Sequence, residues 1–153
     1  MILLQTQWIL GFTDGEGCFH IALNKNASMR LGIQVLPEFT ITQHQRDMRI
    51  LHAFKKHFGC GVVRRKNRHH GDRFCYRVRD RQHLLQTIIP FFEKCTLKTK
   101  KNVDFKKFRR CVHLMESNAH LTSEGLTLIR YIAEEMNNKG ALRQNKGAQK
   151  KSL

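Results

Sequence analysis

The spacing of apolar residues changes its period several times along the chain, and this limits the fold more than any other feature. Apolar and polar residues alternate in residues 19–23 and 31–41, as is typical of two half-buried strands. A helical spacing follows in residues 45–58, and alternation returns in residues 62–66 and 73–79. Antiparallel hairpins of this kind bury one face, which helices must cover. The sequence therefore predicts an α+β protein built on one antiparallel sheet.

Further helices are predicted on either side of these hairpins. Residues 3–13 are largely apolar and run into Asp14-Gly15-Glu16-Gly17, where two glycines favour the end of a helix. A short helix is predicted near residues 82–89, ending at Pro90. Two amphipathic helices follow, with apolar stripes formed by Phe105, Phe108, Val112 and Met115 in one and by Leu126, Ile129, Ala133 and Met136 in the other.

The longest predicted strand contains one residue that does not suit the middle of a sheet. Its apolar face is expected to begin at Leu31 and to include Pro37. Proline cannot donate a ladder hydrogen bond, so Pro37 indicates an edge position or a β-bulge.

The length of 153 residues suits a single domain. We expect residues 1–136 to form that domain and residues 137–153 to form a basic, flexible C-terminal tail, because apolar residues are sparse there. Apolar residues make up 41% of the chain, but no stretch approaches the roughly 20 consecutive apolar residues that a membrane span needs. The sequence thus predicts a soluble, folded protein without a membrane span.

The charge balance indicates a polyanionic partner. Lysine and arginine number 28 against 12 acidic residues, a formal net charge of +16. Such an excess destabilises a compact chain through self-repulsion, so it is best explained by an anionic ligand. Nucleic acid is favoured over the alternative, an anionic membrane surface, so no membrane partner is expected.

The five cysteines do not suggest a disulfide framework. Their number is odd and no CxxC pair occurs, which favours a reducing compartment. Cys60, His69, His70 and Cys75 are conceivable zinc ligands around the second hairpin, but their spacing matches no common zinc motif. Zinc binding is therefore a minor alternative.

The predicted polar face of the sheet carries basic side chains interleaved with amides and hydroxyls. These groups can bond base edges and phosphates, which suits a β-ribbon lying in a DNA major groove. An ordinary solvated surface is the alternative, although such a surface mixes both signs of charge more evenly. The predicted DNA-contacting residues are His20, Asn24, Asn26, Ser28, Arg30, Gln34, Glu38, Thr40, Arg64, Lys66, Arg73, Cys75 and Arg77.

The segment GFTDGEG at residues 11–17 places two carboxylates at a predicted helix end in an otherwise basic chain. Carboxylate and backbone carbonyl oxygens are the ligands that Mg²⁺ prefers, and a metal bound to phosphate promotes attack by water. A helix end with two solvated acids is the alternative interpretation.

Three separated segments point to one protein family. Residues 8–17, WILGFTDGEG, resemble the LAGLIDADG motif of homing endonucleases. Residues 39–43 are similar to the family's strand end with its active-site glutamine, and residues 90–101 to the segment with its active-site lysine. The resemblance covers roughly residues 5–115 and implies the single-motif type. It implies the αββαββα homing-endonuclease fold, a saddle-shaped antiparallel sheet with helices on the convex face.

The resemblance also assigns roles to residues. It implies that Glu16 and the Gly15 carbonyl bind Mg²⁺, and that Gln43 and Lys98 organise the attacking water. Mn²⁺ is expected to substitute for Mg²⁺, and Ca²⁺ to bind without supporting cleavage. A homodimer is implied, with its interface at Trp8, Gly11, Phe12 and Gly15.

The implied activity is site-specific hydrolysis of both strands of double-stranded DNA across the minor groove, leaving 3′ overhangs. Because a homodimer has a two-fold axis, its target is expected to be a pseudo-palindrome of about 20 base pairs. An intron RNA maturase on the same scaffold and a non-catalytic DNA-binding module are the alternatives. The resemblance to single-motif members implies a location in an organelle, either a chloroplast or a mitochondrion. Because no targeting signal is seen, the protein is expected to be synthesised inside that organelle.

The chain departs from the family pattern at two motif positions. Glu16 stands where the motif ends in Asp, and both are hard oxygen ligands, so the metal chemistry is expected to survive. Leu10 stands where the family often has Ala, which bears on the spacing of paired motif helices. Lys100 is an alternative to Lys98 for the active-site lysine.

Overall fold

The computed structural model describes residues 2–66 and 71–137, and it has the predicted α+β organisation. The element order, αββαββα followed by two more helices, confirms the predicted fold. The elements are α1 (Thr6–Glu16), β1 (Gly17–Lys25), β2 (Ile33–His44), η1 (Gln45–Asp47), α2 (Met48–Phe58), β3 (Val62–Arg65), β4 (Arg73–Val78), α3 (Arg81–His83), the π-helical turn η2 (Leu84–Ile88), α4 (Ile89–Lys94), α5 (Lys101–Glu116), η3 (Ala119–Leu121) and α6 (Ser123–Asn137).

The strands form one antiparallel sheet in the order β1-β2-β4-β3. β1 pairs with β2 along its whole length, whereas β4 pairs with β2 only from Phe39 onward. Pro37 therefore faces Ile21 of β1 on one side and lies beyond the β4 pairing on the other. Its missing N–H costs no ladder bond there, and the predicted edge position is confirmed.

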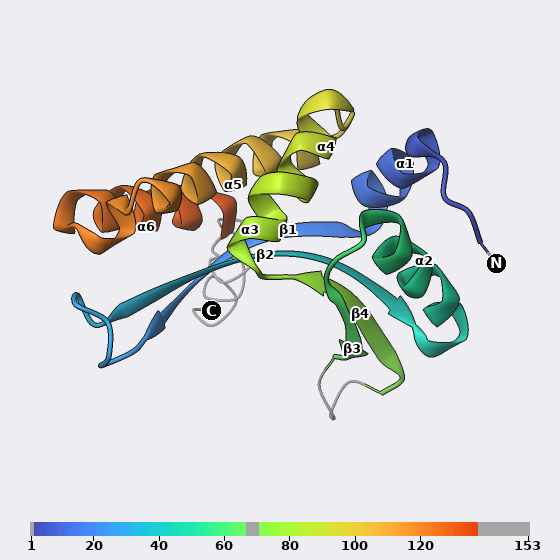
Figure 1. Ribbon diagram of the computed structural model, residues 1–153, viewed down its shortest axis with the longest axis horizontal. Coiled ribbons are helices and arrows are strands. Elements are labelled where there is room, and N and C mark those ends of the chain that lie inside the picture. The colour runs from blue at the N-terminus through green and yellow to red at the C-terminus, as the bar shows by residue number, and fades with distance from the viewer. Residues whose placement is uncertain (1, 67–70, 138–153) are drawn as a thin grey trace, which may run out of the picture.

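The sheet is arched, with its helices on the convex side (Figure 1). The β1–β2 hairpin forms one arm of the arch, and β3 and β4 form the other. Aromatic side chains fill the space beneath the helices, because the alternation directs every second strand residue toward them. Phe19 stacks on Phe39 at 5.0 Å between ring centroids, and its ring lies 5.5 Å from Phe92 and 5.3 Å from Phe105 and Phe108.

Two details differ from the sequence-based expectation. The predicted strand at residues 31–41 begins only at Ile33, and Leu31 lies in the preceding turn with 40% of its surface exposed. That turn is closed by a hydrogen bond from the Asn26 N–H to the Gly32 carbonyl, at 2.9 Å. Turn geometry, rather than the apolar pattern, thus decides where the strand starts.

The helix predicted to end at Pro90 instead continues to Lys94. The π-helical turn Leu84–Ile88 ends two residues before Pro90, and the Ile89 N–H donates to the Leu84 carbonyl five residues back. A proline in an ordinary α-helix clashes with the carbonyl four residues earlier. The wider turn relieves this clash, so the helix passes through the proline.

Some expectations concern residues that the structure does not describe. The prediction of a basic tail at residues 137–153 falls outside the described residues beyond Asn137, as do His69 and His70 of the zinc alternative. Within residues 2–66 and 71–137, no helix has the length and apolar content to cross a bilayer.

The short helix η3 contains a histidine whose charging opposes folding. Nδ1 of His120 is buried without a hydrogen-bond partner among the described residues. Loss of hydration, reinforced by the nearby positive charge of Arg81, holds the pKa of His120 below its usual value. The unfolded chain therefore binds more protons than the folded chain in acid, so stability present above the ordinary histidine pKa falls as the pH drops below it.

We predict that the free energy of unfolding decreases between roughly pH 7 and pH 5 and that His120→Gln makes this decrease smaller. Urea denaturation at the two pH values measures it, with substitution of the exposed His52 by glutamine as the control. Equal pH dependence in the His120→Gln variant and the wild type would contradict the assignment.

Candidate active site

The motif helix passes into the sheet without a connecting loop. α1 ends at Glu16 and β1 begins at Gly17, whose N–H donates to the Thr13 carbonyl. A Cβ at Gly17 would lie 2.6 Å from the Thr13 methyl carbon and 2.8 Å from the Thr13 carbonyl oxygen. Only glycine fits this junction, and the junction holds Glu16 at the edge of the sheet.

The surroundings of Glu16 suit a divalent cation. The residue is exposed, and within the described part of the chain its carboxylate makes no hydrogen bond or ion pair. The carbonyls of the last helical turn, including that of Gly15, lack partners within the helix and carry its partial negative charge. Oxygen ligands of this kind fit Mg²⁺.

The chain alone offers an incomplete metal site. Among the described residues no group of three or more His, Cys, Asp or Glu side chains lies close enough together to hold a metal. Mg²⁺ is commonly bound by one or two carboxylates together with substrate phosphates and water. The donor set at Glu16 therefore fits a metal that is shared with a phosphate ligand.

Asp14, the other acid of the motif, has a different environment. Its Oδ2 accepts the Lys98 N–H at 2.9 Å, and its Oδ1 accepts the Thr99 N–H at 3.1 Å and the Thr99 hydroxyl at 2.7 Å. Burial alone would raise the pKa of Asp14, but these hydrogen bonds outweigh it and lower the pKa below its usual value. This role could not be predicted from the motif, because the donors lie 84 and 85 residues away in the chain.

The structure brings the predicted active-site segments toward the end of α1. Gly17 pairs with Ile41, so Gln43 lies two residues beyond the point where the helix joins the sheet. Lys98 is exposed, and its backbone is held to Asp14. Lys101 was not predicted, yet its Nζ donates to the Gly17 carbonyl beside Glu16.

The strand register places most of the predicted DNA-contacting residues on one face of the sheet. His20 faces Glu38, Asn24 faces Gln34, and Thr40 faces Arg77 across adjacent strands. Cys75 shares this face but is only 6% exposed. The remaining predicted residues on the same face or its edges are Arg64, Lys66 and Arg73, and those in the β1–β2 turn are Asn26, Ser28 and Arg30.

The turn at the tip of the β1–β2 hairpin is ordered by Asn26. Its Oδ1 accepts the N–H of Ser28 at 3.0 Å and the Ser28 hydroxyl at 2.7 Å, and its Nδ2 donates to Gln34 at 3.3 Å. Three of the predicted DNA-contacting residues therefore hold one another in place before any ligand binds.

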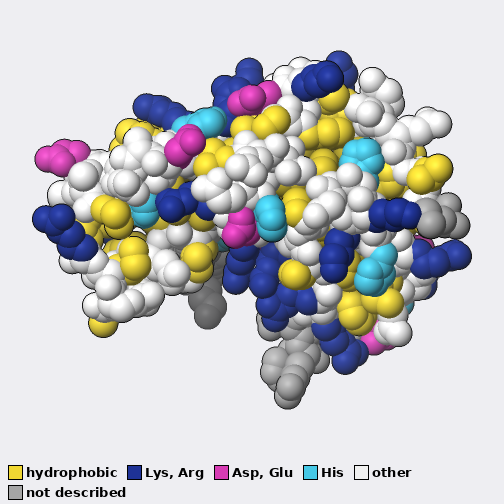
Figure 2. All heavy atoms as spheres, viewed as in Figure 1, with side chains coloured by type: hydrophobic (Ala, Val, Ile, Leu, Met, Phe, Trp, Pro, Cys, Tyr) yellow, Lys and Arg dark blue, Asp and Glu magenta, His cyan; other side chains and the backbone are white. Residues whose placement is uncertain are grey.

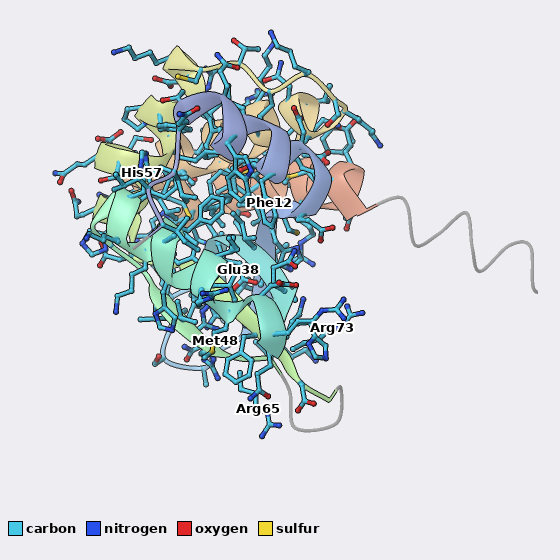
Figure 3. The ribbon with its side chains drawn as sticks, turned by 90° about the vertical axis from the view of Figure 1, so that its right-hand side faces the viewer. Phe12, Glu38, Met48, His57, Arg65 and Arg73 are labelled. Carbon is cyan, nitrogen blue, oxygen red and sulfur yellow. The ribbon has the colours of Figure 1, made fainter. Side chains whose placement is uncertain are left out.

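A basic hollow lies on the concave face of the sheet. Lys and Arg side chains gather there, beneath the middle of the molecule (Figure 2). Figure 3 shows Phe12 toward the helical side and Arg65 and Arg73 toward the opposite side, with Glu38 between them. The hollow is lined by Glu38, Thr40, Thr42, Arg64, Arg65, Lys66, Cys75 and Arg77.

The charges in this hollow are poorly balanced. Loss of hydration and the neighbouring charges of Arg79 and Arg64 lower the pKa of Arg77, and Glu38 and Cys75 partly offset this lowering. Glu38 itself accepts a hydrogen bond from Arg79 at 2.7 Å. Crowded like charges of this sort are stabilised by a bound anion, and phosphate is the anion that arginine binds most readily.

The motif helix exposes a face with little side-chain cover. The Trp8 ring stacks on Phe12 at 4.7 Å but remains 42% exposed. Gly11 and Gly15 are exposed, and an added Cβ at either would meet no atom within 4 Å. Leu10 is instead buried in the chain's own core, with 5% exposed, so it does not lie on this face.

The zinc alternative finds no support in the part of the chain that is described. Cys60 and Cys75 are both buried, and the Cys60 carbonyl accepts the Tyr76 hydroxyl. No cluster of metal-binding side chains surrounds either cysteine in residues 2–66 or 71–137.

Comparison with known proteins agrees with this geometry. Residues 9–112 match the family model described as LAGLIDADG endonuclease. The chain therefore belongs to the LAGLIDADG endonuclease family. Its structure is similar to the crystal structure of the homing endonuclease I-TnaI, with 50% sequence identity and a TM-score of 0.85 over 97% of this chain and 98% of that one.

Other relatives have longer chains. The probable intron-encoded endonuclease Cox1-I1b of Schizosaccharomyces pombe is 35% identical over 120 residues, which is 77% of this chain and 29% of the relative. The DNA endonuclease I-CeuI of Chlamydomonas moewusii is 28% identical over 122 residues, 78% of this chain and 56% of the relative. The chain spans 24–29% of the length of the three curated relatives that rank first.

One solved relative is described with its ligand. The LAGLIDADG homing endonuclease I-SmaMI, bound to cleaved DNA, is 32% identical and has a TM-score of 0.84 over 88% of this chain and 44% of that one. The same enzyme is also described bound to uncleaved DNA in the presence of calcium ions.

We predict that Gly17→Ala lowers the free energy of unfolding by about 1–3 kcal/mol, because the new methyl group overlaps Thr13. Adding Thr13→Ser, which removes the overlapping methyl carbon, should restore part of the loss while the contact with the Thr13 carbonyl remains. Thermal and urea unfolding of both variants, with Thr13→Ser alone as the control, measure the coupling. Purely additive effects would contradict a close approach at this junction.

Proposed function

We propose that this chain is a site-specific, metal-dependent DNA endonuclease that hydrolyses phosphodiester bonds in both strands of its target. The observation that carries the proposal is the position of Glu16, an exposed carboxylate without a protein partner among the described residues, at the helix end beside the basic hollow. The similarity to I-TnaI over nearly the whole of both chains supports it.

The proposed chemistry assigns a separate task to each group. Glu16 and the Gly15 carbonyl would hold Mg²⁺, which supplies a Lewis acid to the scissile phosphate. Gln43 can orient a water molecule by hydrogen bonding. The ammonium group of Lys98 can bind that water or offset charge that accumulates on the phosphate oxygens. The arginines of the hollow would bind flanking phosphates and so fix the position of the duplex.

The metal and product preferences belong to the same proposal. Mg²⁺ would support cleavage, Mn²⁺ would substitute, and Ca²⁺ would occupy the site without turnover. The description of I-SmaMI bound to uncleaved DNA with calcium supports the last point. The two cuts would lie across the minor groove and leave 3′ overhangs.

A homodimer would complete the enzyme, since each chain offers one exposed motif carboxylate and two strands must be cut. Glycine inside a helix costs roughly 0.5–1 kcal/mol relative to alanine. Among the described residues, no atom lies close enough to require glycine at positions 11 and 15. A second motif helix packed closely against them explains both residues, with Trp8 and Phe12 at its side. Such a dimer would bind a pseudo-palindromic site of about 20 base pairs.

The origin of the gene and the extent of the domain are part of the proposal. Several relatives are named as intron-encoded endonucleases, which supports an intron in a chloroplast or mitochondrial gene. Residues 1–136 would form the endonuclease domain, with the basic residues of 137–153 available to bind DNA.

We predict that Glu16→Gln slows DNA cleavage on the order of 10³-fold, because the loss of a metal-binding carboxylate removes several kcal/mol of transition-state stabilisation. DNA affinity should stay the same or increase, since a negative charge near phosphate is removed. The assay incubates protein with a randomised duplex library and Mg²⁺ and sequences the cut ends. The target found there then serves for rate and affinity measurements.

Substitution of Glu134, an exposed acid on α6, by glutamine is the matched control and should not change the rate. A wild-type protein that binds DNA tightly but cuts no member of the library would support a non-catalytic module. Binding confined to intron RNA would support a maturase.

We predict that the wild type has twice the mass of the 18.0 kDa chain in solution and that Gly11→Leu converts it to a monomer without loss of folding. Leucine favours a helix by about 1 kcal/mol over glycine. The substitution should therefore not destabilise the fold of the single chain. Light scattering after size-exclusion chromatography measures the mass. Arg130→Leu, an exposed position on α6, is the control. A monomeric wild type would contradict the proposed interface.

A further inference from the structure

The Asp14 carboxylate binds the loop before α5, a part of the site that is distant in the chain. Three donors reach it: the N–H groups of Lys98 and Thr99 and the hydroxyl of Thr99. The donors lie 84 and 85 residues further along the chain. We call this set of hydrogen bonds the Asp14 clamp.

Among the described residues, Leu97 also anchors this loop, because it packs in the core. Leu97 is buried, with 2% exposed, but Lys98, Thr99 and Lys100 are all exposed. Charge-assisted hydrogen bonds to a carboxylate are roughly twice as strong as neutral ones. The clamp therefore sets where the backbone of Lys98 lies.

The clamp also orders the start of the next helix. The Thr99 hydroxyl that donates to Asp14 accepts the Lys101 N–H at 3.2 Å, and the Thr99 carbonyl accepts the Asn102 N–H at 3.0 Å. The Nζ of Lys101 then donates back to the Gly17 carbonyl. The end of α1 and the beginning of α5 are thus joined at two points on either side of Glu16.

The two motif acids have different tasks as a result. Three donors occupy the Asp14 oxygens, whereas the Glu16 carboxylate makes no hydrogen bond or ion pair to the described residues. Asp14 lies two residues before Glu16 on the same helix, so the clamp relates the backbone of Lys98 to that of Glu16. A lysine side chain is long and flexible, and its reach depends on where its backbone is held.

We propose that Asp14 is a positioning residue for cleavage, which fixes Lys98 beside Glu16 by binding the backbone of the Lys98 loop. The proposal rests on the proposed endonuclease function, because it assigns Lys98 a place at the reacting phosphate. It predicts that Asp14 acts on the rate through Lys98 and leaves DNA binding almost unchanged.

A double-mutant cycle of Asp14→Asn and Lys98→Met tests this link. The amide of asparagine keeps one acceptor oxygen and replaces the other with a donor, so at least one loop N–H loses its partner. We expect Asp14→Asn to slow single-turnover cleavage about 10- to 100-fold. In the Lys98→Met background the same change should slow it less than about twofold. Rate losses that multiply in the double variant would overturn the proposal.

A matched pair at Thr99 tests the clamp without changing an acid. Thr99→Val has nearly the same shape but loses the hydroxyl that donates to Asp14, whereas Thr99→Ser keeps it. We expect the valine variant to cleave DNA more slowly and the serine variant to cleave at the wild-type rate. The DNA dissociation constant of both variants in Ca²⁺ should stay within about twofold of the wild-type value. Equal rates for the two variants, or a loss seen only in DNA affinity, would overturn the positioning role.

Amide hydrogen exchange of the free protein separates failure of the clamp from failure of the proposed function. Asp14→Asn should lower the protection of at least one of the Lys98 and Thr99 amides, while the amide of Phe108 in the core keeps its protection. Unchanged protection at Lys98 and Thr99 would overturn the clamp whatever the activity. If the wild type cuts no DNA, the proposed function is refuted, and so is the positioning role of Asp14 in cleavage. Amide exchange would still test whether Asp14 holds the Lys98 loop.

Discussion

The direct passage from α1 to β1 at Gly17 is the constraint on which the rest of the site depends. With no loop between helix and strand, the direction of β1 sets the place of the helix end and of Glu16. The close approach of Gly17 to Thr13 leaves no room for a side chain there. Because β1 pairs with β2 along its whole length, this one junction relates the motif acid to the polar face of the sheet.

The two faces of the sheet balance opposite physical demands. On the convex side, Phe19 and Phe39 pack against aromatic side chains of the helices and supply the apolar burial that drives folding. On the concave side, the charges of Arg64, Arg77 and Arg79 crowd together at a cost in electrostatic repulsion. A polyanion would relieve that repulsion. The apolar face thus stabilises a charge distribution that is adapted to a ligand.

Much of the fold could be predicted because the alternation of apolar residues is local and strong. The hairpins, the helix at residues 45–58 and the edge position of Pro37 were predicted correctly. The continuation of the helix through Pro90 was not predicted, because a π-helical turn removes the clash that normally ends a helix at proline. Leu31 was placed in a strand because it suits the alternation, but the turn closed at Gly32 excludes it.

The sequence by itself determined the order of elements, the basic character of the chain and the family, since these depend on local patterns and on composition. Only the tertiary structure decided how the two motif acids divide their tasks. Asp14 and Glu16 are both carboxylates near a helix end, and nothing local distinguishes them. The difference comes from the loop at Lys98, which folding brings to Asp14 from 84 residues away. Hydrogen bonds across such a separation leave no trace in the spacing of neighbouring residues.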